Sequence, residues 1–410
     1  MNYKVTITGI DHYGRGIARI DNIITFIPNA LPNEIVEIKI INKKKKFMEG
    51  QVLNFIKKNK NRCQFCNINC GSCHLNNINY SEQLTFKEKK VLDIISKFTK
   101  GNYLIKNIIK NPNPTNYRNK VRFHVEKSIG YYKNKSHEIV EINNCLIVDQ
   151  KINNLLSYIK ENINLENIYE IIIRASKYTD DTMVVFKINN TIDEKKFINI
   201  LKNKVSSLII FDKNYKTIYG NDYIIEKLNE LSFVISPDSF FQVNTAGAIC
   251  LYNKVLEYAN LKQNDNVLDL YCGTGSIGIY LSKYCKKVIG IEINKYAILD
   301  AEKNKKLNNI DNIDFICGDT SKLVNNLKQN FDVTIVDPPR AGLDQNTINY
   351  LNKSNTKKIV YVSCDPVTLA RDLNLLKDKY DILEITPVDM FSYTYHVECV
   401  SVLRRKGIGK

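Results

Sequence analysis

The sequence predicts a multidomain fold of β and α/β type. An N-terminal OB-like β-barrel, a central α+β domain and a C-terminal Rossmann-like α/β domain follow one another. Three observations predict this order: short β-forming runs fill residues 1–56, the pattern from 116 to 235 is mostly strand-like with a few helices, and strands and helices alternate from 236 onward. We therefore place the domains at 1–58, 59–235 and 236–410.

The N-terminal region reads as five short strands. Gly, Asp, Asn and Pro residues stand between them and favour turns, and strands at such short spacing are typical of a small barrel. Barrels of the OB kind frequently bind oligonucleotides. The five runs are YKVTITGI, GIARI, IITFI, EIVEIKI and QVLNFI.

A helix is expected between the barrel and the central strands. The segment 59–80 is rich in Asn and Cys and shows little periodicity. Apolar residues then recur at roughly helical spacing, which predicts a helix over 82–99. They are Leu84, Val91, Ile94, Ile95 and Phe98.

The composition is that of a globular, basic chain. Hydrophobic residues make up 44% of the 410, and 59 Lys and Arg stand against 43 Asp and Glu, a formal net charge of +16. This excess favours a polyanionic partner, although a lysine-rich composition alone produces the same charge. There is no apolar run of membrane-spanning length, and the start, MNYKVTITG, lacks the apolar core of a signal peptide. We expect a cytoplasmic protein without a membrane partner.

A glycine-rich turn follows the first strand of the C-terminal domain. In NVLDLYCGTGSIGIYL, the glycines let a ligand approach the backbone closely between a strand and a helix. A lone GxGxxG also occurs in nicotinamide enzymes, but Asp269 before the glycines would repel a pyrophosphate and suits a cationic amino-acid cofactor. Glu292, at the end of the next strand, can accept hydrogen bonds from a ribose, and Asp319 after the third can reach an adenine. The three strand ends predict an S-adenosylmethionine site.

Cys364 stands at the end of a predicted strand, in YVSCDPVTLARDL, where a helix begins. A structural cysteine is normally buried in a core, whereas this one is presented at a turn. Nearby motifs end a buried strand in Asp337 and place Glu398 in an apolar run. A thiolate that adds to C6 of uracil activates C5 for methylation, and a carboxylate can then remove the C5 proton. Cys364, Glu398 and the S-adenosylmethionine pocket supply the three groups that this chemistry needs.

In these motifs the chain resembles the RNA uracil-5 methyltransferases, close to those acting on 23S ribosomal RNA, over nearly its whole length. The matching motifs are FQVN (241–244), LDLYCG (268–273), DPPR (337–340), SCDP (363–366) with RD (371–372), and DMF (389–391) with HVE (396–398). The resemblance implies that Cys364 is the nucleophile and Glu398 the proton acceptor. It also implies six residues that line the S-adenosylmethionine site: Gln242, Tyr271, Ser276, Glu292, Asp319 and Asp337, the last of which could also contact the uracil.

Two positions depart from this family. Asp365 stands where the family usually has Asn, and Ser392-Tyr393 where it usually has Pro-His. Neither change removes a catalytic atom. We expect Asp389 and His396 to orient their loop rather than to take part in the chemistry.

Four cysteines lie close together in the run RCQFCNINCGSCHL. In a chain without a secretory signal, such clustering favours a metal site over disulfides. The residues alone leave both zinc and an iron–sulfur cluster with a distant fourth ligand open. The run also has the C-x3-C-x2-C spacing of radical enzymes, but it sits outside an α/β-barrel pattern.

The family resemblance implies a [4Fe–4S] cluster, because the related ribosomal RNA enzymes carry a C-x5-C-G-G-C motif and a later cysteine that bind one. The implied ligands are Cys63, Cys70, Cys73 and Cys145. Cys63 is one residue too far from Cys70 for the motif, and Cys66 is too near. We favour Cys63 because Arg62-Cys63 matches the start of the motif, which leaves Cys66 as a spare thiol or an alternative ligand.

The barrel resembles the TRAM module through GRGIA (14–18) and FIPNALPNE (26–34), and YRNK (117–120) also matches the family. These matches imply contacts with RNA, whose target base would flip out of its stack to reach Cys364. By the same resemblance, the helix near 82–114 packs with the catalytic domain.

We therefore expect methyl transfer from S-adenosylmethionine to C5 of a uridine in 23S ribosomal RNA, through a covalent Cys–C6 adduct. One alternative is the T-loop uridine of transfer RNA, whose enzymes usually lack both the barrel and the cysteine cluster. A second is a non-catalytic RNA-binding protein, against which the intact Cys364 and Glu398 argue.

Overall fold

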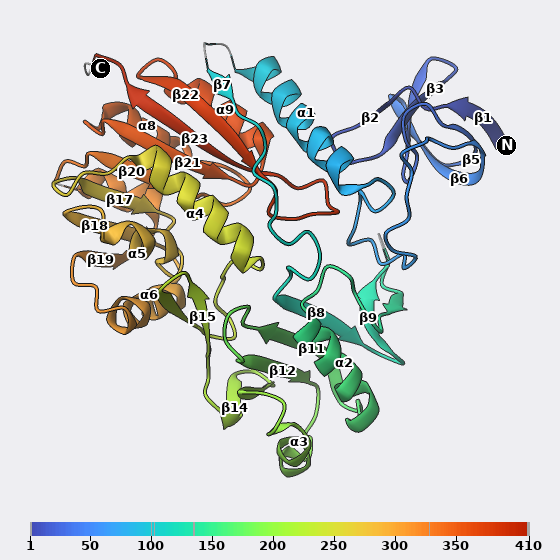
Figure 1. Cartoon of the computed structure of the whole chain (residues 1–410), viewed down its shortest axis with the longest axis horizontal. Coiled ribbons are helices and arrows are strands. Elements are labelled where there is room, and N and C mark those ends of the chain that lie inside the picture. The colour runs from blue at the N-terminus through green and yellow to red at the C-terminus, as the bar shows by residue number, and fades with distance from the viewer. Residues whose placement is uncertain (1, 100, 102, 134–135, 328, 408–410) are drawn as a thin grey trace.

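The computed structural model describes residues 2–99, 101, 103–133, 136–327 and 329–407. Figure 1 shows a small barrel at the N-terminus, a central sheet with helices beside it, and a large sheet covered by helices. Helix α1 (Tyr80–Phe98) lies between the barrel and the large sheet. Among the described residues, no helix is both long and apolar enough to span a membrane.

Six strands form the N-terminal barrel, one more than the sequence predicts, because Gly9–Ile10 pairs as a strand of its own. Alternate side chains point inward and form a core that includes Ile7, Ile27 and Ile38. The sheet order is β1-β5-β6-β4-β3-β2. The strands are β1 (Asn2–Thr6), β2 (Gly9–Ile10), β3 (Gly16–Ile20), β4 (Ile23–Ile27), β5 (Ile35–Lys43) and β6 (Phe47–Lys57).

The central sheet has seven strands in the order β10-β9-β8-β11-β12-β13-β14. Its inner strands carry apolar residues on both faces: Ile171 and Phe186 join a core with α2 and α3, whereas Ile172 and Val185 join the core of the large sheet. The elements are β8 (Lys120–Val125), β9 (Ile129–Tyr132), β10 (Ile139–Glu141), α2 (Gln150–Asn162), β11 (Ile168–Ala175), β12 (Thr182–Ile188), α3 (Glu194–Leu201), β13 (Ser207–Phe211) and β14 (Tyr215–Gly220).

The large sheet has the order β19-β18-β17-β20-β21-β23-β22-β7. Its first five strands are parallel, as the alternation of strands and helices predicts. β23 runs antiparallel to both of its neighbours, because no crossover helix separates it from β22. The strands are β7 (Leu104–Ile105), β17 (Asn266–Leu270), β18 (Lys287–Glu292), β19 (Ile313–Cys317), β20 (Val333–Val336), β21 (Lys358–Ser363), β22 (Tyr380–Val388) and β23 (Glu398–Arg405).

Helices cover both faces of the large sheet, and a hairpin leads into it from the central part. Helix α1, although it precedes the central strands, packs against α9 and β22, and β7 pairs with β22. The remaining elements are β15 (Ile224–Leu228), β16 (Leu231–Ile235), α4 (Thr245–Ala259), α5 (Ser276–Ser282), α6 (Lys295–Leu307), α7 (Thr320–Leu323), η1 (Val324–Asn326), α8 (Gln345–Lys353) and α9 (Pro366–Leu376).

Candidate active site

Four of the residues expected at the cofactor site lie at the carboxyl edge of the large sheet. Tyr271 follows β17, Glu292 ends β18, Asp319 follows β19 and Asp337 follows β20. These strands are neighbours and parallel, so their carboxyl ends meet at one edge. The parallel order therefore gathers residues that are far apart in the chain.

The glycine turn leaves room for a ligand at one position only. A Cβ built on Gly273, which has a φ of 55°, would meet no atom within 4 Å, whereas one on Gly275 would strike Phe315 and one on Gly278 would strike Asp269. The Asp269 side chain is fully buried; its Oδ2 accepts a hydrogen bond from the Gly278 amide at 2.9 Å, but its Oδ1 has no partner. An open glycine beside an unpartnered buried carboxyl oxygen fits a ligand with a cationic amino group.

Other expected cofactor residues are held by hydrogen bonds. Glu292 accepts from the Gly273 amide at 3.1 Å and from the Asn294 amide at 2.8 Å, and Ser276 shares a 2.8 Å hydrogen bond with Tyr252. The Tyr271 hydroxyl donates to Asp344, and Asp319 caps α7 by accepting from Ser321. Gln242 is half-buried, in the segment before α4. The side chains that a cofactor would meet are therefore largely pre-oriented.

Cys364 and Glu398 lie side by side at the ends of two neighbouring strands. β21 and β23 are antiparallel, and Ser363 is paired with Cys399. Cys364 follows directly after β21 and Glu398 begins β23, so the two residues come next to this last pair, and the Glu398 charge acts on the Cys364 thiol. The thiol is partly exposed, whereas the carboxyl is only 8% exposed. The two residues expected to act on the base are thus brought together by strand register.

This site disfavours negative charge. Burial, with help from the nearby Asp337, raises the pKa of Glu398 to about 8, although Arg340 and Lys87 oppose the shift. Burial, Glu398 and Asp337 together raise the pKa of the Cys364 thiol to about 11 against the effect of Arg340. Burial alone raises the pKa of Asp337 to about 7. A cation bound among these three groups would lower all three pKa values.

The loop before Glu398 is anchored by a buried ion pair. Lys87 of α1 donates to Asp389 at 2.5 Å and to the Phe391 carbonyl at 2.9 Å, and both charged side chains are essentially inaccessible to solvent. Tyr80 and Ser392 donate to the second oxygen of Asp389. Asp389 follows Val388, the strand partner of Glu398, so the network fixes the backbone beside the catalytic candidates. This geometry agrees with an orienting role for Asp389.

Two residues of α9 fix the loop that follows Asp337. Asp372 accepts hydrogen bonds from the Leu343 amide and the Tyr361 hydroxyl, and Arg371 donates to the Ala341 and Leu343 carbonyls. The Arg-Asp pair of the motif therefore fixes the turn that follows the two prolines.

The two departures from the family pattern have local partners. Asp365 caps α9 by accepting from the Val367 amide at 2.8 Å, a role that Asn fills equally well. Tyr393 has a φ of 65°, stacks on Phe65 with 3.6 Å between ring centroids, and accepts hydrogen bonds at its carbonyl from the His74 and Leu75 amides. Tyr393 thus links the loop between β22 and β23 to residues 62–75, which we call the cysteine segment.

Three of the four thiols expected to hold a cluster lie together, and the alternative ligand Cys66 lies with them. Cys66, Cys70, Cys73 and Cys145 line one small cavity, which Cys63 does not line. Cys63 is exposed. Burial raises the pKa of the half-buried Cys73 thiol, and the nearby Cys145, Cys70 and Cys66 raise it further. Across the described ranges, no group of three or more His, Cys, Asp or Glu side chains is arranged to hold a metal ion as it stands.

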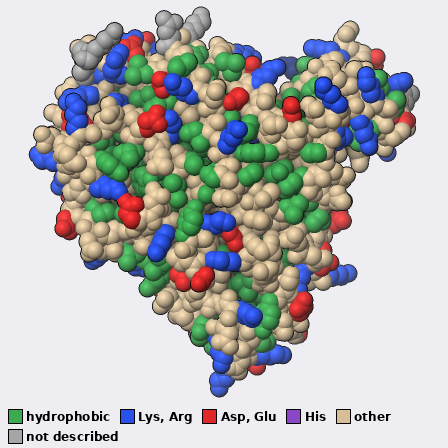
Figure 2. Space-filling view, in the orientation of Figure 1, with side chains coloured by type: hydrophobic (Ala, Val, Ile, Leu, Met, Phe, Trp, Pro, Cys, Tyr) green, Lys and Arg blue, Asp and Glu red, His purple; other side chains and the backbone are tan. Residues whose placement is uncertain are grey.

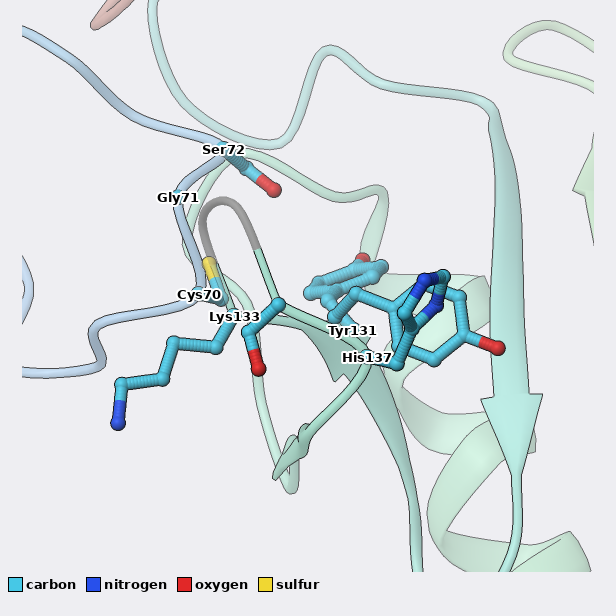
Figure 3. A pocket seen from close by; sticks show the side chains of 8 residues that line it. Cys70, Gly71, Ser72, Tyr131, Lys133 and His137 are labelled. Atoms are coloured by element: carbon cyan, nitrogen blue, oxygen red, sulfur yellow. The ribbon is translucent and has the colours of Figure 1, made fainter.

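A second, open cavity of about 460 Å³ lies between the cysteine segment and residues of β9 and the loop that follows it. Figure 3 shows Gly71 and Ser72 on one side of it and Tyr131 and His137 on the other, with Lys133 beside Cys70. The cavity lies on the central part, away from the edge where the cofactor residues gather.

The sequence did not point us to Lys87, and it did not show that the charge of Arg340 acts on Cys364 and Glu398. Lys87 lies three residues after Leu84 and four before Val91, within the apolar stripe of α1. A lysine at such a position is a signal for a buried ion pair, because an unpaired buried charge is too costly. Arg340 was part of a recognised motif, but its effect on Cys364 and Glu398 appears only once the strands are assembled.

Comparison with known proteins places these features in a family. The model of the tRNA (uracil-5-)-methyltransferase family matches residues 79–330 and 322–406, and the TRAM domain model matches residues 2–53. A protein of Clostridium tetani described as an uncharacterized RNA methyltransferase is 36% identical over 99% of this chain and 96% of its own length. A protein of the same description from Staphylococcus aureus is 36% identical over 98% of this chain and 97% of its own.

A solved structure matches the whole fold. The Pyrococcus abyssi tRNA (uracil-54, C5)-methyltransferase, in complex with S-adenosyl-L-homocysteine, is 28% identical to this chain, with a TM-score of 0.81. The match covers 98% of this chain and 100% of that one, so it includes the N-terminal barrel.

Proposed function

Because this chain belongs to the tRNA (uracil-5-)-methyltransferase family of RNA methyltransferases, we propose that it methylates C5 of a uridine in RNA with S-adenosylmethionine as the donor. The observation that carries the proposal is the strand register that sets Cys364 beside Glu398, next to the edge where the cofactor residues gather. The S-adenosyl-L-homocysteine bound to the archaeal relative supports the choice of donor.

S-adenosylmethionine, when bound, supplies a methyl group on a positively charged sulfur. Asp269 and the open backbone at Gly273 would hold its amino-acid end, Glu292 its ribose and Asp319 its adenine. Gln242, Tyr271, Ser276 and Asp337 complete the proposed lining. The positive charge would also favour ionisation of the Cys364 thiol and of Glu398.

Cys364 loses its proton to solvent and adds through Sγ to C6 of the flipped uracil. The electron pair of the C5–C6 double bond moves toward C5 and O4, and C5 then forms a bond to the methyl carbon as the methyl–sulfur bond breaks. Glu398 removes the remaining proton from C5, the C5–C6 double bond re-forms, and Cys364 leaves with its electron pair. A base with a pKa near 8 is well matched to this transfer.

We propose 23S ribosomal RNA as the substrate. The cysteine segment supports this choice, since it accompanies the ribosomal RNA enzymes that the chain resembles. A transfer RNA uridine is the second candidate, favoured by the archaeal tRNA (uracil-54, C5)-methyltransferase that matches 98% of this chain. Because that match spans the barrel, the presence of a barrel does not argue against transfer RNA, contrary to our expectation from the sequence.

Mapping of 5-methyluridine separates these substrates. We expect mass spectrometry of RNA fragments to show a 5-methyluridine in 23S ribosomal RNA that is missing from cells without the protein. It should return with the native chain or a Cys250→Ala control, but not with Cys364→Ala. A position lost from transfer RNA instead would select the second candidate, and unchanged RNA of both kinds would contradict the reaction.

The covalent step has its own test. RNA in which 5-fluorouracil replaces the target base should trap a stable adduct on Cys364 when S-adenosylmethionine is present, because Glu398 finds no proton at C5 to remove. Glu398→Gln should accumulate the same kind of adduct on ordinary RNA. Peptide mass spectrometry locates the adduct, and its absence from residue 364 would refute the mechanism.

We also propose a [4Fe–4S] cluster held by Cys66, Cys70, Cys73 and Cys145. Four thiols around one cavity are a donor set that suits iron and sulfide, and the Ile68 amide donates to the Cys66 sulfur at 3.4 Å. Cys66 therefore replaces Cys63 in the ligand set implied by the family resemblance. The proposed cluster stabilises the segment between the barrel and the central sheet and takes no part in methyl transfer.

Iron and sulfide content distinguishes the two ligand sets. After anaerobic reconstitution, we expect Cys66→Ser to lose most of the iron, sulfide and visible absorbance, and the matched Cys63→Ser to keep them. The reverse result would return the ligand role to Cys63. A native chain that retains no iron or sulfide would contradict the cluster itself.

A further inference from the structure

One face of the central sheet carries cations and aromatic rings that the proposed reaction does not use. Paired residues of neighbouring strands point to the same face. The pairs of Glu170 with His124 and with Lys187, and of Arg174 with Lys120, therefore set five side chains on one face of three strands. Arg122 lies between Lys120 and His124 on this face. We name the set Lys120, Arg122, His124, Glu170 and Lys187, together with Tyr132 of β9, the cationic face.

Two aromatic rings are stacked at the outer end of the cationic face. The rings of His124 and Tyr132 lie 3.8 Å apart with an interplanar angle of 17°. Tyr132 is 36% exposed, so part of its ring is open to solvent. An exposed stacked ring offers a surface on which a further planar ring can stack.

Positive charge on the cationic face exceeds the negative charge. Glu170 is nearly buried and lies 3.0 Å from Lys187 and 3.5 Å from Arg122, and Lys120 adds a third cation to the face. His124 lies 3.9 Å from Glu170, but burial lowers the pKa of its imidazole, so it adds no full charge near pH 7. One carboxylate cannot neutralise them all, and 60% of the Arg122 side chain is exposed. Ile172 and Val185 of this face pack in the core of the large sheet, and only the part beyond them is open. An open sheet face is ordinarily polar, so these charges alone would not mark a site. Their excess, next to a stacked exposed ring, points to an anionic ligand that contains planar rings.

The inner end of the cationic face adjoins the segment that holds Gln242. Arg174 donates to the carbonyls of Ser239 and Phe241, and the Asn119 amide donates to Val243. Within the same segment the Phe240 side chain is 71% exposed. Asn244 then donates to the Met390 carbonyl, in the loop next to Glu398. The face therefore leads from the candidate active site outward over the sheet.

We propose that the cationic face binds a single-stranded segment of the RNA substrate, with a base stacked on Tyr132 and phosphates at Arg122 and Lys187. The proposal rests on the proposed function and adds to it a second RNA contact. Lys120 and His124 are four residues apart, so the face runs about 13 Å along β8, enough to meet more than one nucleotide. Tyr132 also borders the cavity of Figure 3, where the strand can continue beside Ser72.

Binding measured without S-adenosylmethionine tests this proposal separately from the reaction. The probe is a fluorescein-labelled single-stranded RNA of twelve nucleotides, with a duplex of the same sequence for comparison, followed by fluorescence anisotropy. We expect Tyr132→Ala to weaken single-strand binding about tenfold and Tyr132→Phe to restore it, because stacking needs the ring and not the hydroxyl. Arg122→Gln should weaken binding and lower its salt dependence by about one ion.

Two matched controls lie elsewhere on the surface. Tyr284 is as exposed as Tyr132 but lies after α5, and Lys195 lies on α3, which covers the opposite face of the central sheet. Tyr284→Ala and Lys195→Gln should bind RNA like the native chain. Unchanged binding by Tyr132→Ala and Arg122→Gln, or an equal loss for single strand and duplex, would overturn the proposal. Absence of methylation would contradict the proposed function, but the binding result could still be interpreted, because the assay does not depend on methyl transfer.

Discussion

Cys364, Glu398 and Asp337 each hold a proton more tightly than they would in water. A carboxyl whose pKa is raised by folding stabilises the fold while it is protonated. For Glu398, this contribution is lost as the pH rises from the ordinary pKa of a glutamate to about 8. Activity follows the opposite direction, because the base must be ionised to accept a proton. As the pH rises, the free energy of unfolding is therefore expected to fall while the activity rises.

Arg340 should set the pH range in which the site works. It lowers the pKa of both Glu398 and Cys364, so Arg340→Gln should move the rise of kcat/KM to higher pH, by less than about one unit because the guanidinium is exposed. Arg340→Lys should keep the native profile, as should Lys353→Gln at the exposed end of α8. An unshifted profile for Arg340→Gln, measured from pH 6 to 10, would contradict this account.

At the scale of elements, helix α1 is part of the catalytic region although it precedes the central strands. The apolar stripe of α1 packs in the core on one face of the large sheet. Lys87, the charged residue within this buried stripe, forms an ion pair with Asp389. Burial lowers the pKa of Lys87, and Asp389 opposes that shift. A buried pair of this kind fixes the position of the loop even where its net stabilisation is small.

Breaking this pair should be costly, and removing it altogether should be less so. Lys87→Met leaves the Asp389 carboxylate buried and unpaired, so we expect a loss of about 3–5 kcal/mol in the free energy of unfolding. Lys87→Met combined with Asp389→Asn should recover much of that loss, and Lys89→Met, at an exposed position of the same helix, should cost little. Urea unfolding measures all three; equal stability of the single and double variants would contradict the ion-pair argument.

At the scale of the whole molecule, the cysteine segment connects all three parts. Arg62 forms an ion pair with the buried Glu34 of the barrel at 2.6 Å, Phe65 stacks on Tyr393 of the loop between β22 and β23, and Cys70 packs against the core of the central part. Lys and Arg side chains gather on the barrel in Figure 2. RNA held by the barrel and by the cationic face would therefore meet two surfaces joined by this segment.

The local sequence pattern predicted much of the fold of this protein. Turn residues and short apolar runs predicted the barrel strands, and the alternation of strand and helix predicted the parallel strands whose ends gather Glu292, Asp319 and Asp337. These predictions were possible because side-chain periodicity and turn chemistry depend on neighbouring residues. The motifs around Cys364 and Glu398 also predicted both residues as catalytic candidates, before their positions in the fold were known.

Tertiary structure alone decided the rest. The antiparallel direction of β23 sets Glu398 beside Cys364, Lys87 reaches Asp389 across 302 positions of the chain, and Cys66 rather than Cys63 joins the other thiols. Each of these depends on the packing of segments that are distant in sequence. The local sequence pattern does not determine the direction of a strand in its sheet, the partner of a buried charge, or the orientation of side chains in a loop.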